Sequence, residues 1–169
     1  RNKTTNGTSA LYTKAGTLRG ERVIASKYTL QRYGTSKKSS QYFRAYRVAT
    51  TNRGSVYYKI VSFNGVYRGW IYGGNVSGTF SGGVNPANTM ENANMPVQKT
   101  GYTLNNINKY TLWVDPKWSQ YKAKQVDMSS YTPGDTFTIS DAAMKTRENY
   151  LYYKVTDDKN SAIVGWVYA

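Results

Sequence analysis

The sequence predicts an all-β fold of two small barrels in tandem, related by internal duplication and packed on each other. The first observation is a repeat. Residues 54–74 carry Tyr-Tyr-Lys-Ile, a turn and Gly-Trp-Ile-Tyr, and residues 149–169 restate this order 95 or 96 positions later. The second is a series of apolar segments, each about 4–8 residues long, at spacings of roughly ten residues. The third is the lack of a sustained helical period, which leaves strands as the main element.

Both repeat blocks have the pattern of a β-hairpin with one apolar face. Alternation along a strand sends successive side chains to opposite faces, so it predicts which residues face a core. These core-facing residues are Val56, Tyr58 and Ile60 in the first block, and Leu151, Tyr153 and Val155 in the second. Asn64-Gly65 supplies residues that tolerate a positive φ, as a tight hairpin turn requires. The remaining side chains of each hairpin are therefore free to face solvent or a ligand.

Other strand candidates flank the two hairpins. Residues 10–13 and their counterpart, residues 111–114, each precede a turn-like break. Residues 42–51 and 136–144 alternate polar and apolar side chains and lead into the hairpins. Each half of the chain therefore holds several short strands, as expected of a barrel of SH3-like size.

One segment, residues 22–33, leaves two alternatives open. Ser26 could cap a short helix that runs through Leu30, because a serine side chain can accept a hydrogen bond from the first helical turn. Its β-branched and aromatic residues, among them Val23 and Tyr28, favour a strand instead.

The composition predicts two domains and a connection. From residue 73 to 100 it shifts to Gly, Asn, Ser and Pro, with an edge strand as one option at residues 76–80. We expect a basic first lobe at residues 1–84, a linker at 85–100 and a second lobe at 101–169.

The composition argues against an enzyme. The chain has neither cysteine nor histidine, so it lacks thiol nucleophiles, the usual general base near neutral pH and the commonest transition-metal ligands. The first lobe offers Glu21 as its one carboxylate, whereas a glycosidase needs two. No run of 18 apolar residues predicts a membrane span. We therefore expect no catalytic residues, no cofactor and no metal site.

Charge is concentrated in the first half. Residues 1–84 contain 14 Lys and Arg and one acidic residue, whereas residues 85–169 contain 9 Lys and Arg and 8 acidic residues. The net charges are therefore about +13 and +1. Such asymmetry indicates a polyanionic or polar extended partner for the first lobe, although a merely solvated basic surface is the simpler alternative.

Three runs in the first half resemble a known family. They are residues 43–48 (FRAYRV), 51–59 (TNRGSVYYK) and 67–70 (YRGW). Together they resemble the N-terminal cell-wall-binding region of lactobacillar S-layer proteins of the Lactobacillus brevis type, which is built from bacterial SH3-like repeats. The resemblance implies a secreted protein that is held non-covalently on the Gram-positive cell wall within the S-layer. It also implies that contacts with other S-layer subunits are made by regions outside this chain.

The candidate ligand-binding residues surround the first hairpin. Aromatic rings can stack on the C–H faces of sugars, and arginine can pair a phosphate or bridge vicinal hydroxyls. The candidates are Tyr12, Arg44, Arg47, Arg53, Tyr57, Tyr67, Arg68, Trp70 and Tyr72. Alternatively, Trp70 packs against the end of a small barrel, and the arginines are solvent-exposed strand residues that contact no ligand. Tyr58 and Tyr153 are left out because alternation assigns them to the core.

Three functions compete. The leading hypothesis is a non-catalytic module that binds cell-wall polysaccharide or teichoic acid. Its rival is a nucleic-acid binder, because basic charge interleaved with aromatic residues also describes single-strand grooves. A third hypothesis is a structural module whose tyrosine-rich faces make lattice contacts. Salt dependence separates the first two, since phosphate-dominated binding weakens steeply with salt.

Overall fold

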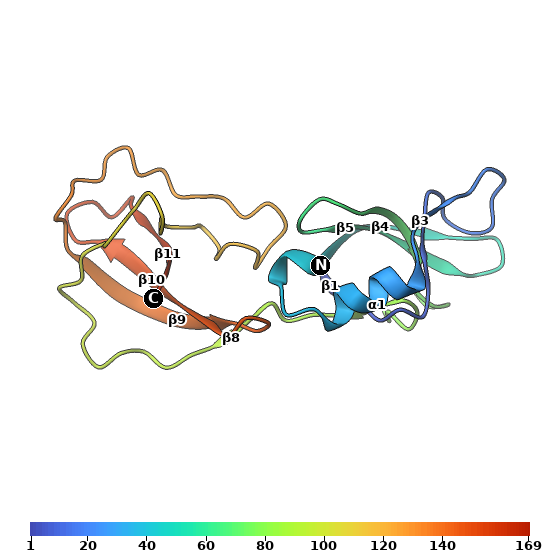
Figure 1. Ribbon diagram of the computed structural model, residues 1–169, viewed down its shortest axis with the longest axis horizontal. Helices are drawn as coiled ribbons and strands as arrows, with labels where there is room; N and C mark the ends of the chain where they lie inside the picture. Colours follow the sequence, from blue (N-terminus) through green and yellow to red (C-terminus); the bar gives the residue numbers. More distant parts are fainter. The chain divides into compact units, whose positions relative to one another are not determined.

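The computed structural model describes residues 1–169, which form two compact units: unit 1, Arg1–Thr89, and unit 2, Met90–Ala169. The fold is mostly β, with one seven-stranded sheet, one four-stranded sheet and one short α-helix (Figure 1). Unit 1 contains β1 (Asn2–Thr5), β2 (Leu11–Tyr12), β3 (Val23–Ala25), α1 (Lys27–Thr35), the 3-10 helix η1 (Ser39–Gln41), β4 (Phe43–Thr50), β5 (Val56–Ser62), β6 (Arg68–Tyr72) and β7 (Val84–Pro86). Unit 2 contains β8 (Met90–Asn92), β9 (Phe137–Lys145), β10 (Tyr150–Asp157) and β11 (Val164–Tyr168). No helix is both long and apolar enough to cross a membrane.

The sheet of unit 1 has the strand order β3-β2-β6-β5-β4-β1-β7, and neighbouring strands are antiparallel. Along β5, Val56, Tyr58 and Ile60 are buried in one core cluster together with Phe43 and Ile71. The predicted alternation of the first hairpin is therefore confirmed. At the hairpin turn Gly65 has φ +75°, and its amide donates to the Ser62 carbonyl at 2.8 Å.

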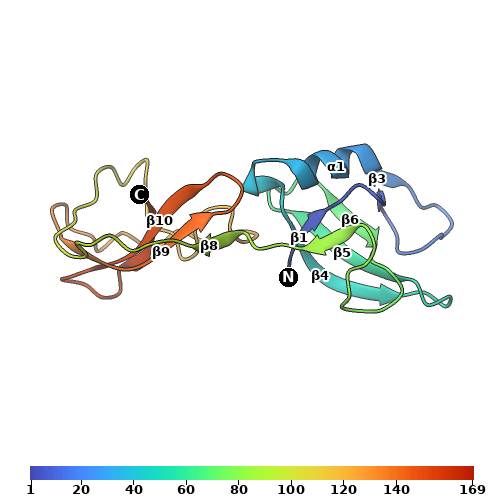
Figure 2. The same ribbon diagram turned by 90° about the horizontal axis from the view of Figure 1, so that it is seen from below.

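The segment with two alternatives forms both structures. Its first residues make β3, and Ser26 then caps α1, its Oγ accepting from the Thr29 amide at 3.2 Å. Leu30 is fully buried in the core cluster, so α1 lies on the core side of the sheet (Figure 2). Gly34 allows this contact, because a Cβ there would overlap the Thr5 carbonyl. The all-β prediction therefore missed one helix, which a single buried leucine and a capping serine stabilise.

The segment predicted as a linker, residues 85–100, contributes to both sheets. Asn85 in β7 pairs with Thr4 in β1. Met90–Asn92 forms β8, which pairs with β9. Residues 76–80 form no strand; Phe80 instead stacks on Tyr58 with ring centroids 4.5 Å apart.

The sheet of unit 2 has the order β11-β10-β9-β8. Its core cluster contains Phe137, Ile139 and Val155, and Tyr153 packs against it partly buried. Tyr152 points to the other face, yet it is only 7% exposed because its ring lies against Tyr168, at 5.7 Å between centroids. The second hairpin therefore buries aromatic surface on both faces.

The two hairpins share their register. Lys59 lies opposite Trp70 in unit 1, and Lys154 lies opposite Trp166 in unit 2. In both sheets the strand before the hairpin contains a bulge at the same place, where Tyr46 or Ser140 has no opposite residue. A bulge adds one residue to one strand and shifts the alternation of its side chains.

The glycine of each Gly-Trp pair also has the same environment. A Cβ on Gly69 would lie 2.6 Å from the Tyr12 carbonyl oxygen, and a Cβ on Gly165 would lie 2.7 Å from the Trp113 carbonyl oxygen. A side chain at either position would therefore push away the neighbouring strand. This close approach explains why both repeat blocks carry glycine before tryptophan.

Candidate ligand-binding site

One face of the unit 1 sheet, the face opposite the core, collects most of the predicted binding residues. Residues directly opposite each other on neighbouring strands share a face, so the strand register identifies the members of this outer face. They are Tyr12, Arg44, Arg47, Tyr57, Lys59, Arg68, Trp70 and Tyr72. Seven of these eight were predicted from the sequence, and Lys59 was not.

The longest row crosses four strands. Tyr12 lies opposite Trp70, Trp70 opposite Lys59, and Lys59 opposite Arg47. With strands about 4.8 Å apart, this row extends roughly 14 Å across the sheet. The Lys59 Nζ lies 5.8 Å from the centroid of the Trp70 ring, within the range of a cation–π contact. The row therefore places two aromatic rings beside two positive charges.

A second row is aromatic. Tyr57 lies opposite Tyr72, with their ring centroids 5.8 Å apart at an interplanar angle of 68°. Burial raises the pKa of Tyr57, and the nearby charges of Glu21, Tyr12 and Tyr72 raise it further. The Tyr57 phenol is therefore a neutral donor and acceptor at physiological pH.

A third row is cationic. Arg68 and Arg44 lie on either side of Val61, which is buried between them in the sheet. The Arg68 Nη1 donates to the Tyr46 hydroxyl at 2.7 Å, and the guanidinium lies 5.4 Å from the centre of that ring. This contact holds the guanidinium plane of Arg68 in one orientation on the surface. Tyr46 belongs to the site and was missed, although plain alternation places it on the same face as Arg44.

Two predicted residues lie outside these rows. Tyr67 follows the hairpin turn and packs against the core cluster, with its ring 5.3 Å from that of Tyr33. Arg53 is exposed in the turn between β4 and β5, beyond the last cross-strand pair, Thr50 with Val56. The structure therefore groups seven of the nine predicted residues on one face.

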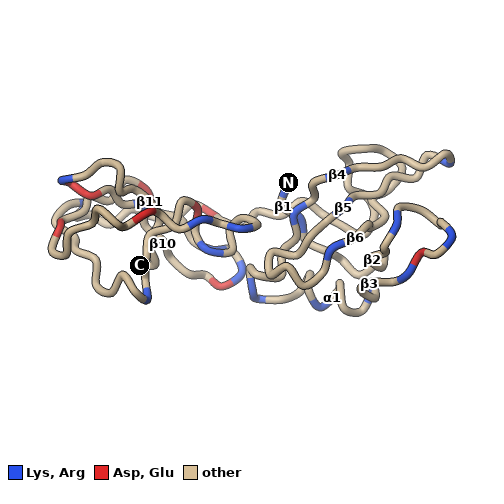
Figure 3. The backbone as a smooth tube through the Cα atoms, turned by 90° about the horizontal axis from the view of Figure 1, so that it is seen from above, with Lys and Arg blue, Asp and Glu red and all other residues tan.

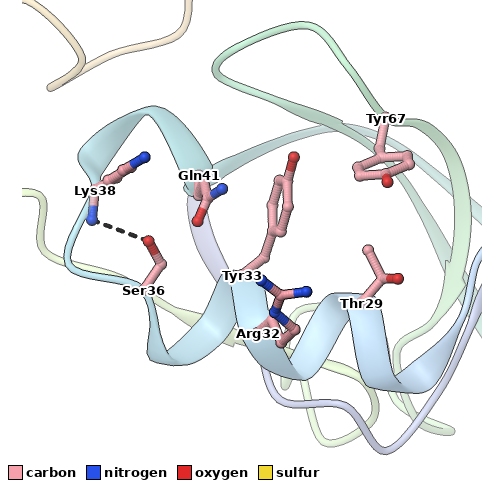
Figure 4. Close-up of a pocket in the computed structure, with 7 residues that line it drawn as sticks. All are labelled: Thr29, Arg32, Tyr33, Ser36, Lys38, Gln41 and Tyr67. Atoms are coloured by element: carbon pink, nitrogen blue, oxygen red, sulfur yellow. Dashed lines mark hydrogen bonds between the residues drawn. The ribbon is translucent and has the colours of Figure 1, made fainter.

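Tyr67 instead lines a pocket on the helix side of unit 1. The pocket has a volume of about 430 Å³ and lies between α1, the segment after it and the hairpin turn (Figure 4). In Figure 4, Thr29 lies beneath the ring of Tyr67 and Arg32 lies beneath the ring of Tyr33. The lining residues are Thr29, Arg32, Tyr33, Ser36, Lys38, Gln41 and Tyr67. Two cations, two tyrosines and no carboxylate make it a second place where unit 1 could hold a hydroxylated or anionic group.

The charge distribution separates the two units. Unit 1 carries 14 Lys and Arg residues with Glu21 as its one acid, whereas acidic and basic residues mix in unit 2 (Figure 3).

Among the carboxylates of unit 2, Asp158 has its pKa lowered by hydrogen bonds from Thr138 at 2.6 Å and Thr136 at 2.7 Å. No group of three or more His, Cys, Asp or Glu side chains is arranged to hold a metal ion.

Comparisons with known proteins find one weak structural similarity. The sequence matches no protein-family model, and no curated protein matches it. Among solved structures, the chain is similar to one described as "putative autolysin from Listeria monocytogenes", with 15% identity and a TM-score of 0.37. That similarity covers 99% of this chain and 59% of the other, so the chain spans about three fifths of that structure's length.

Proposed function

We propose that this chain is a non-catalytic module that binds a cell-wall glycopolymer, either a neutral polysaccharide or teichoic acid. In this proposal it is part of a secreted S-layer protein of a Gram-positive bacterium and holds that protein on the cell wall without a covalent bond. The ligand lies across the outer face of unit 1. Assembly with other subunits belongs to regions outside this chain.

The observation that carries the proposal is the order of side chains on the outer face. Three rows lie side by side, separated by two residues along β5 and β6, or about 7 Å. The rings of Tyr12, Trp70, Tyr57 and Tyr72 are partly exposed and offer apolar faces for sugar C–H groups. Arg44, Arg47, Lys59 and Arg68 stand on the same face and suit phosphate or hydroxyl groups.

Internal duplication supports the proposal. Both units carry a bulge before the hairpin, a Lys opposite a Trp, and a glycine that allows a neighbouring strand to approach closely. We infer that the units descend from one SH3-like repeat, as in the S-layer family that residues 43–59 and 67–70 resemble.

The proposal involves no catalysis, because the outer face does not combine the acid and the base that glycoside hydrolysis needs. The acidic residue of unit 1, Glu21, lies beside the tyrosine row and accepts a hydrogen bond from the Leu18 amide at 3.3 Å. One carboxylate cannot act as both acid and base across a glycosidic bond. The proposal is therefore binding without turnover.

A nucleic-acid strand is the rival ligand, since stacked rings and cations also fit bases and phosphates. The test compares three polymers against the full chain: purified wall teichoic acid, wall polysaccharide with its phosphodiesters cleaved by hydrofluoric acid, and single-stranded DNA. Affinity is measured by calorimetry between 50 and 400 mM salt. Four cations on the outer face give a slope of log affinity against log salt of about −3 for a polyanion.

The variants are Trp70→Ala and Arg47→Ala, with Arg53→Ala as a control that removes the same charge from outside the rows. We expect both outer-face variants to bind teichoic acid at least about fivefold more weakly, and the control to change affinity less than twofold. Near-UV circular dichroism verifies that each variant is folded. Tighter binding to DNA than to either wall polymer would refute the proposal, as would equal losses in Arg47→Ala and Arg53→Ala.

A further inference from the structure

Unit 2 keeps the aromatic half of the outer face and loses the cationic half. Its four-stranded sheet has an outer face in the same register, where Tyr152 lies opposite Tyr168 and Lys154 lies opposite Trp166. These pairs correspond to Tyr57 with Tyr72 and Lys59 with Trp70. The ring surface of the first unit is therefore repeated in the second.

Unit 2 also has an aromatic residue in the place that Tyr12 takes in unit 1. Trp113 forms a bridge with Trp166, where the amide of each donates to the carbonyl of the other at 2.8 and 2.7 Å. Tyr12 occupies this place in unit 1, opposite Trp70. A tryptophan in place of a tyrosine enlarges the flat apolar surface at this end of the row.

Three further contacts gather tyrosines around Tyr168. Its ring centroid lies 5.4 Å from that of Tyr150, 5.7 Å from that of Tyr152 and 5.8 Å from that of Tyr110. Tyr110 and Tyr168 remain 38% and 42% exposed, so part of their ring surface faces solvent. Aromatic surface clustered in this way, and still accessible, is suited to stacking on a ligand.

This cluster borders a cavity of about 370 Å³, which Tyr110, Trp113, Tyr152 and Tyr168 help to line together with Gln125 and two lysines, Lys109 and Lys117. The volume lies within the range of about 300–1,000 Å³ that small-ligand pockets occupy. The Lys117 Nζ lies 5.7 Å from the centroid of the Trp113 ring and 5.5 Å from that of Trp118. The site therefore combines ring faces with amide, hydroxyl and ammonium donors.

The three arginines of the first face have no counterparts here. By register, Arg44, Arg47 and Arg68 correspond to Thr138, Asp141 and Val164. Unit 2 contains a single arginine, Arg147, and its net charge is about +1. Paired recognition of phosphate oxygens depends on the planar arginine fork, so this face lacks the groups that pair a phosphate in that way.

We propose that unit 2 holds a second carbohydrate site, in the cavity bordered by Tyr110, Trp113, Tyr152 and Tyr168, that takes uncharged sugar residues. The inference rests on the proposed function and adds that the two units bind different parts of the polymer. Unit 1 binds the phosphorylated parts of a wall polymer, and unit 2 binds its neutral sugars by stacking.

The test uses the full chain and wall polysaccharide from which hydrofluoric acid has removed the phosphodiesters. We expect Tyr168→Ala and Tyr110→Ala each to weaken binding of this neutral polysaccharide about five- to tenfold. Tyr168→Phe keeps the ring and should retain most of the affinity. Tyr28→Ala, which removes a 67% exposed ring on α1, is the matched control and should have no effect.

Salt provides a second readout. Affinity for the neutral polysaccharide should change less than about twofold between 50 and 400 mM salt, because no phosphate contact is formed. Unchanged affinity in both alanine variants would overturn the second site and leave the proposed function standing. If the parent chain binds neither intact walls nor the neutral polysaccharide, the proposed function itself fails.

Discussion

Replacing Gly69 by alanine tests the close approach of strands on which the outer face depends. A Cβ at this position would lie 2.6 Å from the Tyr12 carbonyl oxygen, 2.7 Å from Ile24 Cδ1 and 3.1 Å from Leu11 Cγ. The Tyr12 oxygen belongs to the backbone of β2 and cannot move without shifting that strand, and Leu11, also in β2, is packed in the core. The substitution must therefore displace β2 from β6.

The cost follows from the contacts that are disturbed. Overpacking of this kind costs about 1–3 kcal/mol, and each weakened backbone hydrogen bond between β2 and β6 adds about 1 kcal/mol. We therefore expect Gly69→Ala to lower the free energy of unfolding of unit 1 by about 2–4 kcal/mol. Displacing β2 also separates Tyr12 from Trp70, so affinity for wall polymer should fall in the same variant.

The assay is amide hydrogen exchange on peptides from each unit, with urea unfolding as the global measure. Exchange should accelerate in unit 1 and remain unchanged in unit 2. Gly165→Ala should produce the reverse pattern, because its Cβ would lie 2.7 Å from the Trp113 carbonyl oxygen. Gly65→Ala is the control: its Cβ meets nothing within 4 Å, and its positive φ costs about 1–2 kcal/mol. A loss in Gly69→Ala no greater than in Gly65→Ala would refute the reasoning.

Three further predictions concern titration and capping. Burial raises the pKa of Tyr152 to about 12, so its stabilising effect is present below pH 10 and is lost as the pH rises through 12. In an absorbance titration, Tyr152→Phe should show one fewer tyrosine ionising near pH 12 than the parent chain. Between pH 10 and 12 its free energy of unfolding should fall by up to about 3 kcal/mol less than that of the parent chain. A hydrogen bond with Asp157 and burial raise the pKa of Asp135 above 3.8, so the proton on Asp135 stabilises the fold at low pH and stability falls as the pH rises through the raised pKa. Thermal unfolding of Asp135→Asn should therefore show a smaller decline between pH 4 and 7, and an unchanged decline would contradict the pairing of the two carboxyls. Ser26→Ala should lower the stability of unit 1 by about 0.5–2 kcal/mol, because its Oγ caps the Thr29 amide, and an unaltered urea midpoint would exclude that role.

The sequence predicted the hairpins well because their burial is local. Along β5, alternation alone assigned Val56, Tyr58 and Ile60 to the core, where they are buried. It predicted α1 only as one alternative, because the helix is nine residues long and buries one residue, Leu30. So short an apolar pattern does not stand out from that of a strand.

The candidate site was predicted in part for a similar reason. Tyr57, Trp70 and Tyr72 follow from the alternation of their own hairpin. The position of Tyr67 could not be predicted in this way. Tyr67 lies in the turn before β6, and this turn directs its ring toward Tyr33 and the core. Side-chain direction at the end of a turn depends on what packs there, and α1 supplies that partner from 34 residues upstream.

By itself, the sequence determined the repeat, the strand character of both hairpins and the concentration of net positive charge in the first half. All three are read directly from residue order and composition. Tertiary structure alone decided which charges share a surface. Plain alternation puts Arg44 and Arg47 on opposite faces, but the bulge at Tyr46 brings both to the outer face, since Arg44 pairs with Val61 and Arg47 with Lys59. A bulge exists only where two strands pair unequally, so the periodicity of one strand cannot reveal it.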